Sequence, residues 1–149
     1  YTLSWTERFF DQIWNDWYPA RNDNRHKLTV NATHRFNGKF DMYMQWNYHT
    51  GDRTTIPTQI IDGHLYYSNP YNHKLPDYHR LDIGFNFRKT TRRGNESIWN
   101  LSIYNAYCRM NPLFAMVSTT IREDKVEDYK FVTLGVLPII PTFSYTLKF

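Results

Sequence analysis

Two aspartates are the residues of this chain best placed to do acid–base chemistry. Asp41 and Asp82 are predicted to share one face of a β-sheet, and paired carboxylates can hydrolyse a glycosidic bond when they flank it at a defined separation. The sequence gives no sign of such a separation. Arg35, Arg80 and Arg88 are predicted on the same face, which favours a solvated ladder of ion pairs. We therefore expect no enzymatic activity.

Metal chemistry would have to come from histidine or cysteine. Cys108 is the single cysteine, so no internal disulfide can form. None of the histidines forms a close pair with a cysteine or a carboxylate at the spacing of a structural zinc site. We expect surface roles for them, with no metal and no cofactor. The histidines are His26, His34, His49, His64, His73 and His79.

Aromatic rings in two predicted long loops are the best candidates for ligand binding. Flat rings with polar edges stack on sugars and pack against peptides. Packing of loop against loop, which would make the loops rigid, is an equally good interpretation. The candidate residues are Trp14, Trp17 and Tyr18 in the first loop, and Tyr66, Tyr67 and Tyr71 in the second.

The elements that position these residues are predicted to be β-strands with one apolar and one polar face. In the last strand, Phe143, Tyr145 and Leu147 alternate with Thr142, Ser144 and Thr146. Successive side chains of a strand point to opposite sides of the sheet, so this pattern separates apolar from polar residues. The same alternation predicts strands over residues 1–10, 26–36, 40–50, 78–88, 98–107 and from about 129 to 149.

Two local signals refine these strands. The Asn37-Gly38 pair predicts a tight hairpin turn between the second strand and the third. Pro138 and Pro141 interrupt the last strand, where they are predicted to mark bulges.

Composition is compatible with a membrane barrel and excludes a membrane helix. Aromatic residues make up 18% of the chain, yet the mean hydropathy is -0.68. No apolar run approaches the ~18 residues of a spanning helix, whereas a barrel strand shows lipid only its alternate residues. The formal charge of +4 comes from basic residues scattered over strands and turns, so we expect no nucleic-acid partner.

The polar face of the predicted strands would line the lumen of such a barrel. A lumen needs polar side chains in strand interiors, opposite a lipid-facing apolar surface. The predicted lumen-lining residues are Thr29, Asn31, Arg35, Gln45, Asn47, Arg80, Asp82, Asn86, Asn100 and Ser102.

The connections alternate between short and long, as in outer-membrane barrels. Short turns follow residue 36 and span residues 89–97, whereas residues 11–25, 51–77 and about 109–128 form long loops. Six strands cannot close a barrel, because the smallest bacterial barrels have about eight. We therefore expect residues 1–149 to be one segment of a larger barrel, and the start within a strand at Tyr1 is interpreted as a cut.

The sequence resembles the C-terminal part of the TonB-dependent outer-membrane transporters of the Bacteroidetes type. The matching blocks begin at Tyr18, Thr50, Leu75, Trp99 and Ile139, and they read YPAR, TGD, LPDYHRLD, WNLSIYNAYCRMNP and IIPTFSYTLKF. The resemblance implies the last six strands of an antiparallel transmembrane β-barrel of about 22 strands with a plugged lumen. It also implies that the plug and the segment that contacts TonB precede these residues.

The aromatic end of the chain resembles the signal by which the barrel-assembly machinery recognises its clients. The residues that carry this resemblance are Phe143, Tyr145 and Phe149. An ordinary edge strand that ends on an aromatic residue is the alternative.

The function implied by the resemblance is active uptake of a nutrient (a glycan, a peptide or a metal chelate) across the bacterial outer membrane. The expected partners are outer-membrane lipid and lipopolysaccharide, the TonB complex and the barrel-assembly machinery. The C-terminal blocks differ from those of the starch-transporter branch, so a surface lipoprotein partner stays open. A passive porin, a scaffold barrel in a surface complex, and a soluble carbohydrate-binding β-sandwich are the alternatives.

Overall fold

β-Strands form the whole framework of the protein. The computed structural model describes residues 1–135 and 137–149. Of these described residues 66% lie in strands, which form antiparallel sheets, and none lies in a helix. No described segment is a helix long and apolar enough to cross a membrane. The all-β class predicted from the alternation of side chains is therefore confirmed.

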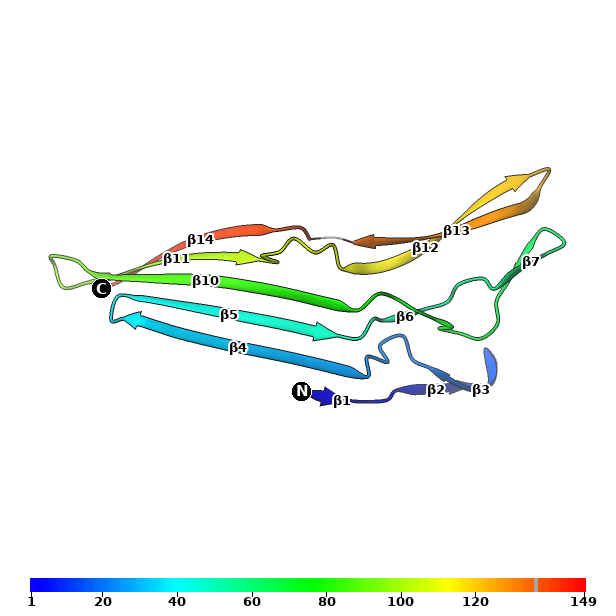
Figure 1. The fold of residues 1–149 in the computed structure, drawn as a ribbon, viewed down its shortest axis with the longest axis horizontal. Helices are drawn as coiled ribbons and strands as arrows, with labels where there is room; N and C mark the ends of the chain where they lie inside the picture. The colour runs from blue at the N-terminus through cyan, green and yellow to red at the C-terminus, as the bar shows by residue number, and fades with distance from the viewer. Residues whose placement is uncertain (136) are drawn as a thin grey trace. The chain divides into compact units, whose positions relative to one another are not determined.

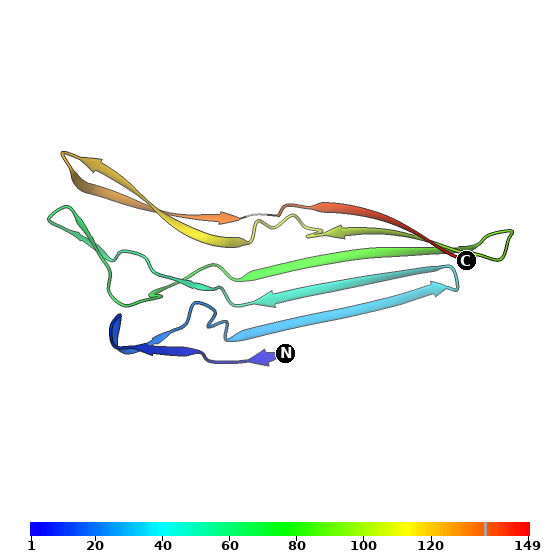
Figure 2. The same ribbon diagram turned by 180° about the vertical axis from the view of Figure 1, so that it is seen from behind.

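The largest sheet has six strands in the order β1-β4-β5-β10-β11-β14. Each strand is bonded to the next sheet strand along the chain, and β4, β5, β10, β11 and β14 lie side by side in both ribbon views (Figures 1 and 2). No closed barrel forms among the described residues, because β1 and β14 are the two edges of the sheet. The strands are β1 (Thr2–Leu3), β4 (His26–Asn37), β5 (Phe40–His49), β10 (Tyr78–Thr90), β11 (Glu96–Tyr104) and β14 (Ile140–Lys148).

The strands β4, β5, β10 and β11 confirm the predicted segments to within a few residues at each end. The predicted hairpin between β4 and β5 also forms. Its turn is capped by Asn37 Oδ1, which accepts hydrogen bonds from the amides of Lys39 (2.8 Å) and Phe40 (2.9 Å). Between β10 and β11, Gly94 adopts a φ of 84° in the predicted short polar turn, which glycine allows without strain.

The prediction of one strand over residues 1–10 is wrong. β1 pairs with the start of β4, where Thr2 lies opposite Lys27. β2 (Glu7–Phe10) instead pairs with β3 (Trp14–Pro19). The break is stabilised at Thr6, whose amide donates to Asp23 Oδ1 over 3.1 Å rather than to a neighbouring strand.

The three predicted long loops are also corrected, because hairpins occupy most of them. Backbone groups of such long segments are satisfied by pairing with one another, which makes local two-stranded sheets. These small sheets pair β2 with β3, β6 with β9, β7 with β8, and β12 with β13. The strands not yet bounded are β6 (Arg53–Thr54), β7 (Gln59–Ile61), β8 (His64–Tyr66), β9 (His73–Lys74), β12 (Pro112–Arg122) and β13 (Lys125–Gly135).

The predicted last strand from about residue 129 is in fact two strands with different partners. β13 pairs with β12, whereas β14 pairs with β11. The predicted bulge at Pro141 is wrong, since Pro141 lies opposite Ile103 in an unbroken register. Proline is tolerated there because β14 is an edge strand. Pro138 lies outside the strands, in the connection that precedes β14.

The chain divides into two compact units, each made from three separate stretches. Unit 1 contains Tyr1–Lys27, His49–Tyr78 and Asn111–Val136, and it buries the polar Asp23 and Asn24 as well as the apolar Tyr18 and Leu75. Unit 2 contains Leu28–Tyr48, His79–Met110 and Leu137–Phe149, and it holds most of the six-stranded sheet.

Candidate functional site

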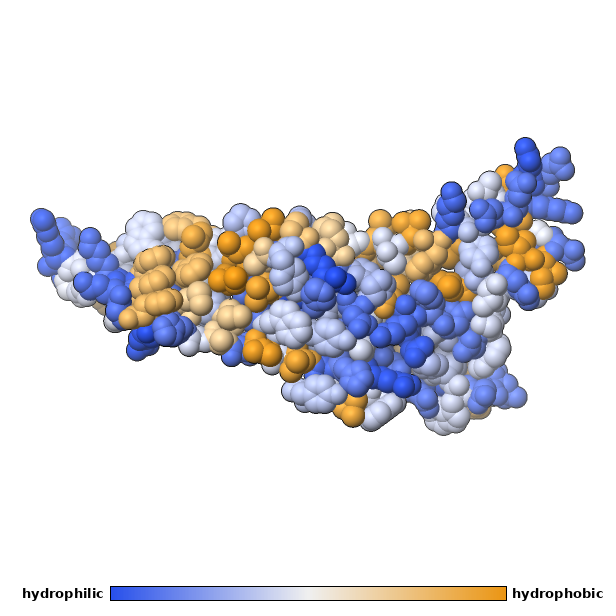
Figure 3. All heavy atoms as spheres, in the orientation of Figure 1, coloured by the Kyte–Doolittle hydropathy of each residue, from blue (hydrophilic) through white to orange (hydrophobic). Residues whose placement is uncertain are grey.

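One face of the sheet in unit 2 is apolar across four strands. The register places Phe85 opposite Leu101, and Leu101 opposite Phe143 on the next strand. Because opposed residues share a face, this row continues from β10 through β11 to β14. Phe40 of β5 joins it, with its ring centroid 4.6 Å from that of Phe87 and 6.1 Å from that of Phe85. Figure 3 shows hydrophobic side chains gathered over this sheet.

The apolar face lies open over much of its area. Trp99 is 46% exposed, Leu101 45% and Phe143 60%, although the rings of Trp99 and Phe143 contact each other. Within unit 2 the described residues form a single layer, so nothing in that unit buries the face. Contiguous apolar patches of this kind mark surfaces that contact another protein or a membrane.

The opposite face carries a connected chain of polar side chains. Asn100 Nδ2 donates to Asn86 Oδ1 over 2.8 Å, and Asn86 Nδ2 donates to Asp41 Oδ2 over 2.9 Å. Arg88 Nη1 binds the other carboxylate oxygen of Asp41. Asp41 is buried, so the predicted ion pair exists but is not solvated as expected.

A second ion pair lies near the other end of β10. Arg80 binds Asp82 through Nε (3.0 Å) and Nη2 (2.8 Å), and its guanidinium lies 4.1 Å from the centre of the Tyr104 ring. Asp82 Oδ1 also accepts a hydrogen bond from the amide of Asn105 (3.0 Å). Two fixed carboxylate–arginine pairs are therefore built into the polar face.

The structure brings together most of the predicted lumen-lining residues. Besides the two networks above, Asn47 Oδ1 accepts from Thr29 Oγ1 (3.1 Å) and from Gln45 Nε2 (3.2 Å). The remaining predicted residues lie on the same strands without a side-chain hydrogen bond among the described residues; they are Asn31, Arg35 and Ser102. That this face borders a lumen stays a prediction.

Sequence reasoning passed over the role of Tyr43 on this face. A Cβ atom on Gly84 would overlap the Tyr43 ring, so the tyrosine of β5 packs directly over the backbone of β10. Asn100 Nδ2 lies 3.4 Å from the Tyr43 hydroxyl. A glycine inside an otherwise regular strand is the signal that could have predicted this close approach.

The predicted loop aromatics lie in unit 1, but they do not form one cluster. Trp14, Trp17 and Tyr18 belong to β3, and Tyr66 ends β8, so four of them lie on strands. Trp14, Trp17, Tyr66 and Tyr67 are exposed, whereas Tyr18 is buried and stacks on Tyr71 with 6.3 Å between ring centroids. Tyr71 also lines a pocket of unit 1.

Buried polar residues tie the segments of unit 1 together around Asp23. Asp23 Oδ2 lies 3.4 Å from Arg53 Nε and 3.5 Å from Arg25 Nε, and its other oxygen accepts from the Thr6 amide. The neighbouring Asn24 donates to the Thr50 carbonyl (2.8 Å) and to Asp52 Oδ1 (2.6 Å). Residues far apart in the sequence are held at fixed positions by this network.

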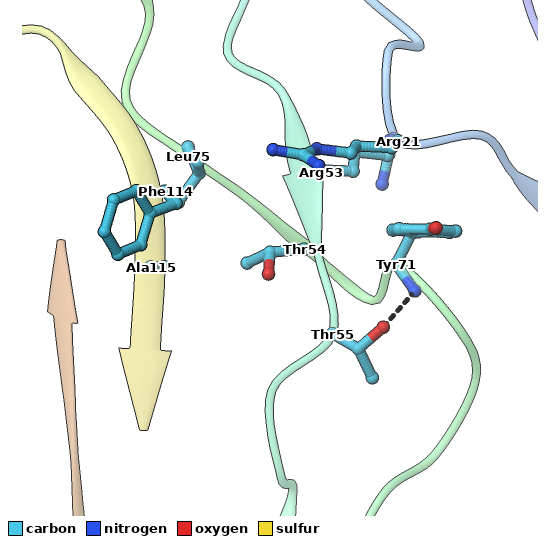
Figure 4. A pocket seen from close by; sticks show the side chains of 8 residues that line it. All are labelled: Arg21, Arg53, Thr54, Thr55, Tyr71, Leu75, Phe114 and Ala115. Carbon is cyan, nitrogen blue, oxygen red and sulfur yellow. Dashed lines mark hydrogen bonds between the residues drawn. The ribbon is translucent and has the colours of Figure 1, made fainter. Parts of the chain in front are cut away.

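A pocket of about 320 Å³ lies in unit 1 (Figure 4). Arg21, Arg53, Thr54 and Tyr71 are grouped on one side of it, while Leu75 and Phe114 lie on the other. The sequence reasoning missed this pocket, because its residues come from three separate stretches and no periodicity relates them. The lining residues are Arg21, Arg53, Thr54, Thr55, Tyr71, Leu75, Phe114 and Ala115.

The predicted assembly signal lies at the end of the sheet. Phe143 and Tyr145 belong to β14, where both contact Trp99 of β11, with ring centroids 5.6 and 4.7 Å away. Phe149 follows the last residue of β14 and is 98% exposed. Recognition by an assembly machinery stays a prediction.

The geometry thus offers an amphipathic sheet and a cationic pocket, and no metal-binding cluster among the described residues. No protein-family model, curated protein or solved structure matches the chain.

Proposed function

We propose that this chain forms part of the wall of an outer-membrane β-barrel that takes up a nutrient in a TonB-dependent manner. In this proposal the six strands are the C-terminal strands of an antiparallel barrel of about 22 strands, a size class with a plugged lumen. The observation that carries the proposal is the sheet of unit 2, with an exposed apolar face and a hydrogen-bonded polar face.

The two faces match the two surroundings of a barrel wall. Lipid requires apolar side chains on one side, and Phe85, Leu101 and Phe143 supply a continuous row of them. A water-filled or plugged lumen tolerates the charged and amide groups of the other side, such as Asp41 and Arg88. A soluble sandwich would instead bury the apolar face under a second layer, which the described residues of unit 2 do not supply.

The sheet edges set a further requirement on this proposal. The backbone of β14 is bonded on the side of β11 only, and an open edge is not tolerated in hydrocarbon. The proposal therefore needs additional strands next to β1 and β14, contributed by parts of the protein beyond this sheet.

The mechanism follows from this arrangement. A substrate would bind outside the membrane to loops of the barrel and to the plug. A pull by TonB on the plug would then open a path along the polar face, where fixed groups such as Asn86, Asn100 and Arg80 offer hydrogen bonds to a passing polar solute. The polar face needs no chemistry of its own for this role, because transport requires only weak, repeated binding.

The test is uptake by cells that express the full-length protein, measured for a panel of radiolabelled acidic and neutral oligosaccharides. The proposal predicts that the protein is recovered in the outer membrane and that uptake stops when TonB is deleted or the proton-motive force is collapsed. Uptake that continues without TonB would identify a passive porin instead. Recovery of the protein in the aqueous fraction without detergent would exclude the membrane role and favour the soluble sandwich.

A further inference from the structure

The pocket of unit 1 has an excess of positive charge. Two arginines line it, Arg21 and Arg53, and no acidic residue does. Arg21 is exposed and makes no side-chain hydrogen bond or ion pair among the described residues. An unneutralised guanidinium at a pocket wall is suited to an anionic ligand, because its planar donors match a carboxylate in a bidentate way.

Arg53 is held in place by Asp23, which does not line the pocket. Its Nε lies 3.4 Å from Asp23 Oδ2, and Asp23 is only 5% exposed. Asp23 also lies beside Arg25 and accepts a hydrogen bond from the Thr6 amide. The single negative charge of Asp23 is therefore shared between Arg53, Arg25 and this amide. One carboxylate therefore faces two arginines while Arg21 stays unpaired, which leaves net positive charge near the pocket.

Tyr71 is fixed at the pocket wall by its backbone and by its ring. Its φ is 53°, a conformation that few residues other than glycine adopt, and its amide donates to Thr55 Oγ1 over 2.9 Å. Its ring stacks on the buried ring of Tyr18, with an angle of 28° between the planes. Strained backbone that surroundings keep in place is frequent at ligand-binding positions.

The opposite wall is apolar. Phe114 of β12 is 40% exposed at the pocket, and the buried Leu75 lies beside it (Figure 4). Aromatic rings of this kind pack against the flat, C–H-rich faces of sugars. Hydroxyl groups of Thr54 and Thr55, which also line the pocket, can donate and accept hydrogen bonds.

We propose that this pocket binds an acidic sugar through its carboxylate. The carboxylate would pair with Arg21 and Arg53, the sugar hydroxyls would meet the two threonines, and Phe114 would cover one face of the ring. A volume of about 320 Å³ lies at the small end of ligand pockets, so one or two sugar units fit. As a statement about the transported substrate this rests on the proposed function, whereas the binding itself does not.

Titration calorimetry on the detergent-solubilised full-length protein tests the binding. The probes are D-galacturonate and D-galactose, which differ at the carboxylate, and inorganic phosphate. We expect galacturonate to bind at least about tenfold more tightly than either other probe, because hydrogen bonds to a charged group are the strong ones. Equal affinity for galactose would overturn the role of the charge. Equal affinity for phosphate would overturn the assignment to a sugar.

Variants locate the binding in this pocket. Arg21→Gln should weaken galacturonate binding about tenfold, since it removes the unpaired guanidinium. Arg25→Gln is the matched control, because Arg25 carries the same charge and lies beside the same Asp23 but does not line the pocket. Phe114→Ala should weaken binding of galacturonate too, through loss of the apolar wall. Equal weakening by Arg25→Gln, or unchanged binding in both Arg21→Gln and Phe114→Ala, would overturn the proposal.

Failure of this inference is separable from failure of the proposed function. Pocket-dependent binding of galacturonate without TonB-dependent uptake would retain the site and contradict the transporter. TonB-dependent uptake that Arg21→Gln leaves unchanged, with no galacturonate binding, would retain the transporter and contradict the site.

Discussion

At the scale of single residues, the polar face of the sheet depends on Asp41. Its two carboxylate oxygens are occupied by Arg88 and Asn86, and the side chain is buried. A buried charge keeps its place only when it is paired and hydrogen-bonded, because desolvation otherwise disfavours it. The alternation of side chains predicted that Asp41 and Arg88 share a face. It could not predict the burial of Asp41, whose carboxylate is bonded by Asn86 and Arg88 of the neighbouring strand β10.

Replacing Asp41 by asparagine should destabilise the protein by about 1–3 kcal/mol. Arg88 loses its charged partner, and the new side-chain NH2 group faces the N–H donor of Arg88 or of Asn86. The measurement is urea-induced unfolding in detergent micelles. Glu96→Gln is the control, since the Glu96–Lys148 pair (3.1 Å) is exposed and such pairs contribute about 0–1 kcal/mol. Equal losses for the two variants would contradict the described burial of Asp41.

A second residue-scale prediction concerns the contact between Tyr43 and Gly84. Gly84→Ala should cost about 1–3 kcal/mol, because the new methyl group overlaps the Tyr43 ring. Gly38→Ala is the matched control, since a Cβ there meets nothing within 4 Å. In a Tyr43→Ala background, Gly84→Ala should cause almost no further loss of stability. A Gly84→Ala variant as stable as Gly38→Ala would show that the ring lies elsewhere.

At the scale of elements, alternation predicted the strands whose two faces meet different surroundings. β4, β5, β10 and β11 each repeat with period two, so their position follows from sequence alone. β12 falls within a segment for which the sequence predicts a loop, because Leu113, Phe114 and Met116 do not alternate strictly with polar residues. For β13 and β14 the sequence predicts a single strand, since both are rich in apolar residues. The sequence gives no measure of which partner strand each will pair with.

Ile83→Arg tests the face assigned to β10. If Ile83 faces the middle of a bilayer, the substitution should destabilise the refolded full-length protein by about 2–4 kcal/mol in lipid vesicles. Gln45→Arg introduces the same charged side chain on the exposed polar side of β5, and it should cost less than about 1 kcal/mol. An Ile83→Arg protein as stable as the Gln45→Arg protein would remove the lipid-facing assignment.

At the scale of the whole molecule, each unit is assembled from three stretches of the chain. This is why the amphipathic sheet could be predicted and the cationic pocket could not. Strand faces follow from a local repeat, but the meeting of Arg21, Arg53 and Phe114 depends on long-range pairing. The glycine at position 51 shows the same dependence. Its backbone lies so close to the Leu75 carbonyl that a Cβ would overlap it.

The central claim is that the sheet separates lipid from a polar lumen, and spin-label accessibility along β11 tests it most directly. Nitroxides would be placed one at a time at Trp99, Asn100, Leu101, Ser102 and Ile103 of a Cys108→Ser full-length protein in lipid vesicles. We expect the accessibility of the labels to alternate with a period of two residues along β11. Oxygen, which concentrates in lipid, should reach the labels at 99, 101 and 103, and a water-soluble nickel chelate those at 100 and 102. Equal access of the chelate to all five positions would contradict the account.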